Sequence, residues 1–207
     1  VKSLGVIRYA AHAVMKTGET SPPGNILGMP LAVRMGRGHS SLVNLHSDGK
    51  KVKPENIVIM GARSVDPGER LLIKEKGIKV FSMHEIDRYG MSAVMDEALA
   101  YLRSKEVDGV HLSLDLDGLD PLYTPGVGTP VPGGISYRES HLSLEMLDAA
   151  GGMTSFLFFD VILDQGPAGS NTGYHIGDTV GEGGRRKDNI RCNYRSSCFS
   201  VWALAFL

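Results

Sequence analysis

A pair of aspartates follows a short apolar segment near the middle of the chain. Asp115 and Asp117 lie at the end of residues 109–116, a predicted buried strand, and an Asp-Pro turn follows them. Side chains alternate along a strand, so these two carboxylates should point to the same side. An open α/β sheet binds ligands at the ends of its strands, and hard divalent cations prefer carboxylate oxygens. The pair therefore predicts half of a metal site; the alternative is a turn in which aspartate bonds the backbone.

Apolar segments of strand length alternate with amphipathic segments of helix length along most of the chain. The predicted strands are residues 5–10, 56–61, 78–83, 109–116 and 155–163. The predicted helices are residues 66–77, 92–104 and 137–149. For the first helix, Asp66 is a good N-cap, Glu69 completes a capping box and Gly77 is a good terminator. This alternation predicts an α/β fold of three αβα layers around a mainly parallel sheet.

Composition narrows the class of protein. The chain has 207 residues, enough for one domain with a core, and its net charge of −1 favours neither nucleic acid nor a membrane surface as partner. No apolar stretch reaches the roughly 18 residues of a membrane span. Val1 leads directly into a strand-like segment without a secretory signal, and the only cysteines are Cys192 and Cys198. These features predict a cytoplasmic protein in a reducing compartment.

The residues after the aspartate pair carry a longer pattern. Residues 113–139 read SLDLDGLDPLYTPGVGTPVPGGISYRE and resemble the third signature of the ureohydrolase (arginase and agmatinase) family. The resemblance runs from about residue 4 to residue 164 and is closest to arginases. The segment Val65-Asp66-Pro67-Gly68-Glu69 favours arginase over agmatinase. We therefore expect an arginase-like domain over residues 1–164, with the family's sheet incomplete at both ends.

The resemblance implies a reaction and its cofactor. Arginases hydrolyse L-arginine to L-ornithine and urea with two Mn²⁺ ions that activate a bridging water, and they form trimers or hexamers. The implied partners are thus L-arginine and further copies of the chain. Agmatinase and formimidoylglutamase activities are the alternatives within the family.

The implied metal ligands are His12, Asp115 and Asp117. The family's DAHxD segment reads Ala10-Ala11-His12-Ala13-Val14 here, so Ala10 and Val14 replace two ligand aspartates. The Gly-Gly-Asp-His segment of the family would precede residue 1. We therefore expect at most one Mn²⁺ ion, and the alternative role of His12 is structural.

The implied substrate residues are Asp66, Glu69 and Thr129, and the first two are equally compatible with a helix cap. Asp160 aligns with a catalytic glutamate that grips the substrate guanidinium; its alternative role is that of a strand-end aspartate. Lys16 replaces an asparagine that contacts the substrate. It would either repel a cationic substrate or form a salt bridge to the remaining site aspartates in place of metal.

Further exchanges lie in the same region. Pro23 and Leu27 stand where the family has serine and histidine, and residues 165–207 show neither helical nor strand periodicity. We predict that residues 165–207 are a poorly ordered, atypical tail. The chain as a whole is interpreted as a truncated and substituted arginase copy. The alternatives are a catalytically dead arginase-like protein that pairs with intact subunits, and a fragment that does not fold stably.

Overall fold

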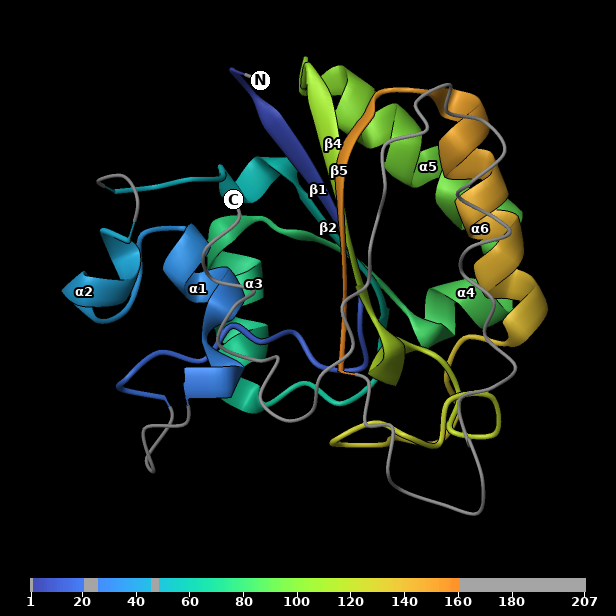
Figure 1. Cartoon of the computed structure of the whole chain (residues 1–207), viewed down its shortest axis with the longest axis horizontal. Coiled ribbons are helices and arrows are strands. Elements are labelled where there is room, and N and C mark those ends of the chain that lie inside the picture. The colour runs from blue at the N-terminus through green and yellow to red at the C-terminus, as the bar shows by residue number, and fades with distance from the viewer. Residues whose placement is uncertain (1, 21–25, 46–48, 161–207) are drawn as a thin grey trace, which may run out of the picture.

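The computed structural model describes residues 2–20, 26–45 and 49–160 (Figure 1). Part of the last predicted strand (residues 161–163), Pro23 and the predicted tail lie outside these residues. All three layers of the predicted αβα fold are present within them, so the predicted fold class is confirmed.

The central sheet has five parallel strands in the order β3-β2-β1-β4-β5. They are β1 (Leu4–Tyr9), β2 (Ile57–Ala62), β3 (Lys79–Ser82), β4 (Gly109–Asp115) and β5 (Met153–Phe159). Each starts within two residues of its predicted position. In the described range, β1, β2 and β4 are almost entirely buried, as expected for strands covered on both faces.

Helices cover both faces of the sheet (Figure 1). One face carries α1 (Pro30–Arg34), α2 (Ser40–Val43) and α3 (Pro67–Lys76), and the other carries α4 (Met83–Tyr89), α5 (Met91–Ser104) and α6 (Tyr137–Ala150). Short 3₁₀ turns span Ile26–Gly28, Pro54–Asn56 and Leu116–Gly118. The helices α3, α5 and α6 were predicted within one residue, whereas the short α1, α2 and α4 were not. None of the described helices is long and apolar enough to cross a membrane.

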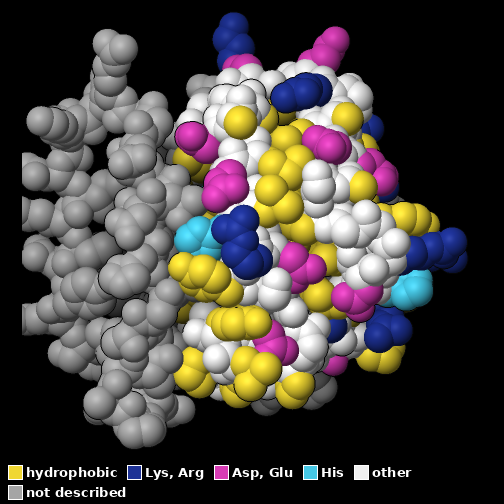
Figure 2. All heavy atoms as spheres, turned by 90° about the vertical axis from the view of Figure 1, so that its right-hand side faces the viewer, with side chains coloured by type: hydrophobic (Ala, Val, Ile, Leu, Met, Phe, Trp, Pro, Cys, Tyr) yellow, Lys and Arg dark blue, Asp and Glu magenta, His cyan; other side chains and the backbone are white. Residues whose placement is uncertain are grey.

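The core consists mainly of two apolar clusters, one on each face of the sheet. Ile7, Met60 and Leu112 pack toward α4, α5 and α6, whereas Ile57 and Ile59 pack toward α1 and α3. Figure 2 views the side of α5 and α6, where hydrophobic side chains gather between charged ones. The two clusters hold the sheet between the two helix layers. The loops that follow the strands lie at the edge of the sheet.

The strand order reverses between β1 and β4. From β1 the chain builds outward to β2 and β3, and it then returns to add β4 and β5 on the opposite side of β1. The register pairs Arg8 with Ser113 and Tyr9 with Leu114, so β1 and β4 end side by side. At such a reversal the crossing connections leave to opposite faces and open a crevice at the carboxyl edge. A ligand site is therefore expected at the carboxyl edge, between the residues after β1 and those after β4.

The ends of α3 match the sequence prediction. Asp66 and Glu69 form the capping box, and Gly77 ends the helix in the left-handed conformation with φ of +64°. Glycine tolerates this conformation because it has no Cβ.

Replacement of Gly77 by alanine should lower the free energy of unfolding by about 1 kcal/mol, because alanine is strained in the left-handed region. Gly18 is the matched control. An added Cβ meets nothing within 4 Å at either glycine, but Gly18 has no positive φ. Urea denaturation of Gly77→Ala and Gly18→Ala measures both effects, and equal stability of the two variants would contradict the role of backbone strain.

Candidate metal and substrate site

The aspartate pair adopts a turn and not the predicted strand end. β4 stops at Asp115, and residues Leu116–Gly118 form a 3₁₀ turn in which the Asp115 carboxylate accepts a hydrogen bond from the Asp117 N–H at 3.2 Å. The argument from strand alternation is therefore wrong for Asp117. Both side chains are nevertheless buried at 4% exposure, and they lie at the carboxyl edge as expected.

A third carboxylate joins this pair from the neighbouring strand. Asp160 follows β5 directly, and oxygen atoms of Asp115, Asp117 and Asp160 lie within 4.8 Å of one another. The Gly128 N–H lies 3.2 Å from both carboxylate oxygens of Asp160 and donates to them. The sequence comparison gave Asp160 a substrate role, whereas the structure places it in a carboxylate cluster that could hold a metal ion.

His12 approaches the carboxylate cluster from the β1 side. It follows β1, and its Nδ1 lies 2.7 Å from Oδ2 of Asp117. The other oxygen of Asp117 accepts a hydrogen bond from the Ala11 N–H at 2.9 Å. Burial raises the pKa of Asp117, but the contacts with His12 and Ala11 outweigh it and hold this pKa below its usual value. The structure therefore brings together all three predicted metal residues, His12, Asp115 and Asp117.

Arg8 is a member of the site that the sequence analysis missed. Its Nη2 donates to Oδ2 of Asp115 at 2.9 Å, and both side chains are almost fully buried. Burial raises the pKa of Asp115 well above its usual value, and the Arg8 charge opposes that rise. Burial also raises the pKa of Asp160, against the effect of the Gly128 N–H. The available signal was an arginine inside an otherwise apolar strand, Leu-Gly-Val-Ile-Arg-Tyr.

The positions of the two replaced ligands, Ala10 and Val14, flank His12 in the segment after β1. Ala10 is fully buried and offers no ligand atom. Val14 has φ of +48°, a region that branched side chains rarely adopt and that aspartate and asparagine tolerate better. The backbone at Val14 thus suits the residue type that the resemblance implies there better than the one present.

On the predicted substrate side, the carboxylates already have partners. The Glu69 oxygens accept hydrogen bonds from the N–H groups of Met15 and Asp66, at 2.9 and 3.1 Å. Lys16 Nζ lies 2.7 Å from Asp66 Oδ2, and this hydrogen bond lowers the pKa of Asp66 and raises that of Lys16. The expected salt bridge from Lys16 to the site aspartates is therefore wrong, since Lys16 pairs with Asp66.

Thr129 lies on the loop that reaches Asp160. It is exposed, and the Gly128 N–H next to it binds the Asp160 carboxylate. Leu27 is also exposed, at 56%, in the turn before α1. Neither residue is brought into the carboxylate cluster.

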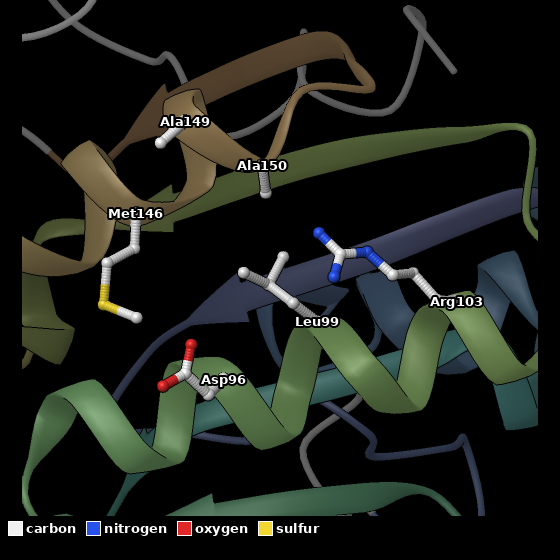
Figure 3. Close-up of a pocket in the computed structure, with 6 residues that line it drawn as sticks. All are labelled: Asp96, Leu99, Arg103, Met146, Ala149 and Ala150. Carbon is white, nitrogen blue, oxygen red and sulfur yellow. The ribbon is translucent and has the colours of Figure 1, made fainter.

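A surface hollow of about 280 Å³ lies away from the site, between α5 and α6 (Figure 3). Asp96, Leu99 and Arg103 line it from α5, and Met146, Ala149 and Ala150 line it from α6. Its lining combines the charged side chains of Asp96 and Arg103 with four apolar ones. We place the functional site at the carboxylate cluster, because that is where the buried ionisable groups converge.

Comparison with known proteins identifies the family. The family model described as "Arginase family" matches residues 1–162. The chain belongs to the arginase family. It is 65% identical to the arginase of Bacillus subtilis (strain 168) over 164 residues, which cover 78% of this chain and 55% of that protein. For the arginase of Bacillus caldovelox the identity is 57%, over 78% of this chain and 54% of the relative. The chain thus spans about half the length of these curated relatives.

Solved structures agree with this assignment. The crystal structure of arginase from Bacillus subtilis subsp. subtilis str. 168 superposes with a TM-score of 0.78 at 61% identity, covering 82% of this chain and 58% of that one. An Entamoeba histolytica arginase in complex with L-ornithine superposes with a TM-score of 0.70 at 35% identity, over 77% and 53% of the two chains. A formimidoylglutamase from Bacillus subtilis, 18% identical, shares the fold alone.

Arg63 ties the site loop of this arginase-family chain to the sheet. Its guanidinium donates to the carbonyl oxygens of Asp117, Gly118 and Leu119 at 2.8 to 3.0 Å, and also to those of Gly61 and Val131. One planar group with five donors can satisfy several converging carbonyls at once. Arg63 thereby fixes the turn that carries Asp117.

Asp120 holds the far side of the same loop. Its carboxylate accepts hydrogen bonds from the N–H groups of Leu122, Gly133 and Gly134, at 2.7 to 3.0 Å. Burial raises the pKa of Asp120, but these three donors and the nearby Arg63 outweigh it, so the pKa lies below its ordinary value. The carboxylate form is therefore the one that stabilises the loop.

Replacement of Arg63 by methionine should lower the free energy of unfolding by about 3 kcal/mol, because several partly buried carbonyls lose their donor. Arg88→Met is the control, since Arg88 is exposed on α4 and stacks only over the Tyr89 ring among the contacts found for it. Chemical denaturation measures both variants. A loss for Arg63→Met no larger than that for Arg88→Met would show that the loop does not depend on this guanidinium.

The stability contribution of Asp120 should depend on pH. Because its folded pKa lies below the unfolded value of about 4, the contribution is present above that value and is lost as the pH falls through the folded pKa. Asp120→Asn should thus be less stable than the wild type at pH 7, and the gap should shrink below about pH 4. Urea titrations over this range test it, with Asp148→Asn, an exposed change on α6, as control. A gap that stays constant with pH would refute the assignment.

Proposed function

We propose that the chain is part of an arginase-type hydrolase, whose reaction converts L-arginine and water into L-ornithine and urea. The observation that carries the proposal is the convergence of three carboxylates and His12 at the reversal of the strand order. This is the chemistry expected of a divalent-cation site in an open α/β sheet. Membership of the arginase family supports the same reaction class.

The cofactor of the proposal is one Mn²⁺ ion. Carboxylate oxygens from Asp115, Asp117 and Asp160, with the imidazole of His12, form a donor set that suits such an ion. A bound divalent ion lowers the pKa of water and supplies hydroxide near neutral pH. The residues fit one ion and not two, because Ala10 and Val14 supply no ligand.

For the substrate, we propose that Asp66 and Glu69 face the amino-acid end of L-arginine and that Thr129 lines the substrate pocket. Asp66 is the group best placed for the α-ammonium, since its carboxylate is exposed and binds a cation, Lys16, at 2.7 Å. Lys16 competes with the substrate for it. Asp160 has two candidate roles, to hold the cation or the substrate guanidinium, and its place in the carboxylate cluster favours the first.

A second candidate function is an arginase-like protein that binds a cation and does not hydrolyse arginine. The pairing of Lys16 with Asp66 favours it, as does the absence of ligand atoms at Ala10 and Val14. We further propose a cytoplasmic protein that assembles with copies of itself as a trimer or hexamer. The lack of cysteine in residues 1–191 agrees with a reducing compartment.

Thermal unfolding with and without Mn²⁺ tests the cation site. A ligand that binds only the folded state raises the midpoint, and saturation at about 100 times Kd adds about 2.7 kcal/mol, a rise of roughly 5 to 10 °C for a chain of this size. Asp117→Asn should abolish the rise, whereas Asp148→Asn should retain it. A wild-type midpoint that does not move would reject the cation site.

A urea-release assay on the same samples separates the two functions. Release of urea that Asp117→Asn abolishes is the result expected of the hydrolase. Mn²⁺ binding without urea release would establish the second candidate instead, since a single ion would then not replace the two-ion centre that the resemblance implies.

A further inference from the structure

The buried Arg8 lies inside the carboxylate cluster. Besides its 2.9 Å contact with Asp115, its Nη1 donates to Ser113 Oγ at 3.2 Å, and its guanidinium lies 4.9 Å from the centre of the Phe159 ring. Its partners thus come from β4 and β5, the two strands that also carry the site carboxylates. Arg8 is only 5% exposed, so its guanidinium is shielded from solvent.

The contacts of Asp115 differ from those of the other two carboxylates. One Asp115 oxygen accepts from Arg8 and the other from the Asp117 N–H. In contrast, within residues 2–20, 26–45 and 49–160, Asp160 accepts from the Gly128 N–H, and Asp117 accepts from the Ala11 N–H and contacts His12. Among the described contacts of the three carboxylates, the guanidinium is bonded to Asp115, and it carries a permanent positive charge.

We infer that Arg8 is an internal counter-ion that withholds Asp115 from metal, so that Asp117 and Asp160, with His12 beside Asp117, are the groups that remain for a cation. The inference rests on the proposed cation site and specifies its ligands. It also gives a second reason why the two-ion centre of the family does not fit here. The Arg8 guanidinium is bonded to Asp115, which the resemblance assigns to metal.

Charge balance supports this arrangement. The cluster contains three carboxylates, and one guanidinium together with one divalent ion neutralises them. A second divalent ion would leave an excess of positive charge at a buried position, which is unfavourable. Without Arg8, the buried Asp115 carboxylate would lack a counter-ion and would be available to the metal.

The register of the sheet holds Arg8 in place. Arg8 pairs with Ser113 across β1 and β4, two residues before Asp115 on the same face of β4. The Phe159 ring covers the guanidinium from β5. The counter-ion is therefore fixed by strand pairing and not by a flexible loop.

The test measures Mn²⁺ affinity by equilibrium dialysis and titration calorimetry. Arg8→Met should bind one Mn²⁺ ion with a Kd about tenfold or more below that of the wild type, because Asp115 becomes a fourth ligand. In the Asp115→Asn background, the same Arg8 change should alter Kd by less than about threefold. Arg88→Met, which removes an exposed charge, is the control for net charge.

A second comparison does not require Arg8→Met to fold. Asp117→Asn should raise the Mn²⁺ Kd far more than Asp115→Asn in chains that keep Arg8. Equal weakening by both changes would overturn the inference, since Asp115 would then be a ligand despite Arg8. An Arg8→Met chain whose Mn²⁺ affinity equals that of the wild type would overturn it as well. If the wild type binds no Mn²⁺ but Arg8→Met does, the proposed cation site of the wild type fails together with its ligand set, while the counter-ion role of Arg8 stands.

Discussion

The parallel pairing of β1 with β4 is the constraint on which the site depends. These strands are more than a hundred residues apart in the chain, and their register runs from Leu4 opposite Gly109 to Tyr9 opposite Leu114. It brings His12 and Asp117 within 2.7 Å at the point where the strand order reverses. A shift of one residue would turn Asp115 toward the opposite face of the sheet and separate it from Arg8. The apolar clusters on both faces oppose such a shift, because it would also expose their buried side chains.

Backbone N–H groups hold two of the site carboxylates in position. N–H groups of Ala11 and Gly128 donate to Asp117 and Asp160, so these carboxylates are held by fixed dipoles at the strand ends. The left-handed conformation of Val14, which suits aspartate better than valine, lies in the same loop as His12. The backbone shape of the loop at this position therefore suits a carboxylate residue better than the valine present. Conformation in this region is set by its neighbours more than by the local residue.

The sequence predicted the features that depend on local pattern. Strand and helix periodicity located the five strands and the three longer helices, and the capping residues Asp66 and Glu69 located the start of α3 within one residue. Shorter helices such as α2, four residues long, have too few turns to show a period. The partners of charged side chains were not predictable in this way. Arg8 meets Asp115 across 107 residues of sequence, and Lys16 turns to Asp66 because loop geometry brings the two together.

Arg8 and Lys16 each form an ion pair with a carboxylate that the resemblance assigns to a metal or to the substrate. Arg8 pairs with a carboxylate of the proposed cation site, and Lys16 pairs with a carboxylate of the proposed substrate side, so each places a positive charge against an acidic group at this edge of the sheet. A guanidinium can balance the charge of Asp115, but it offers no open coordination position and cannot hold a water molecule for ionisation as a metal does. On the inference made above, Arg8 takes one carboxylate out of the proposed cation site and leaves the others for a metal. The same buried contact then stabilises the folded edge of the sheet while it reduces the number of ligands that a metal can use there.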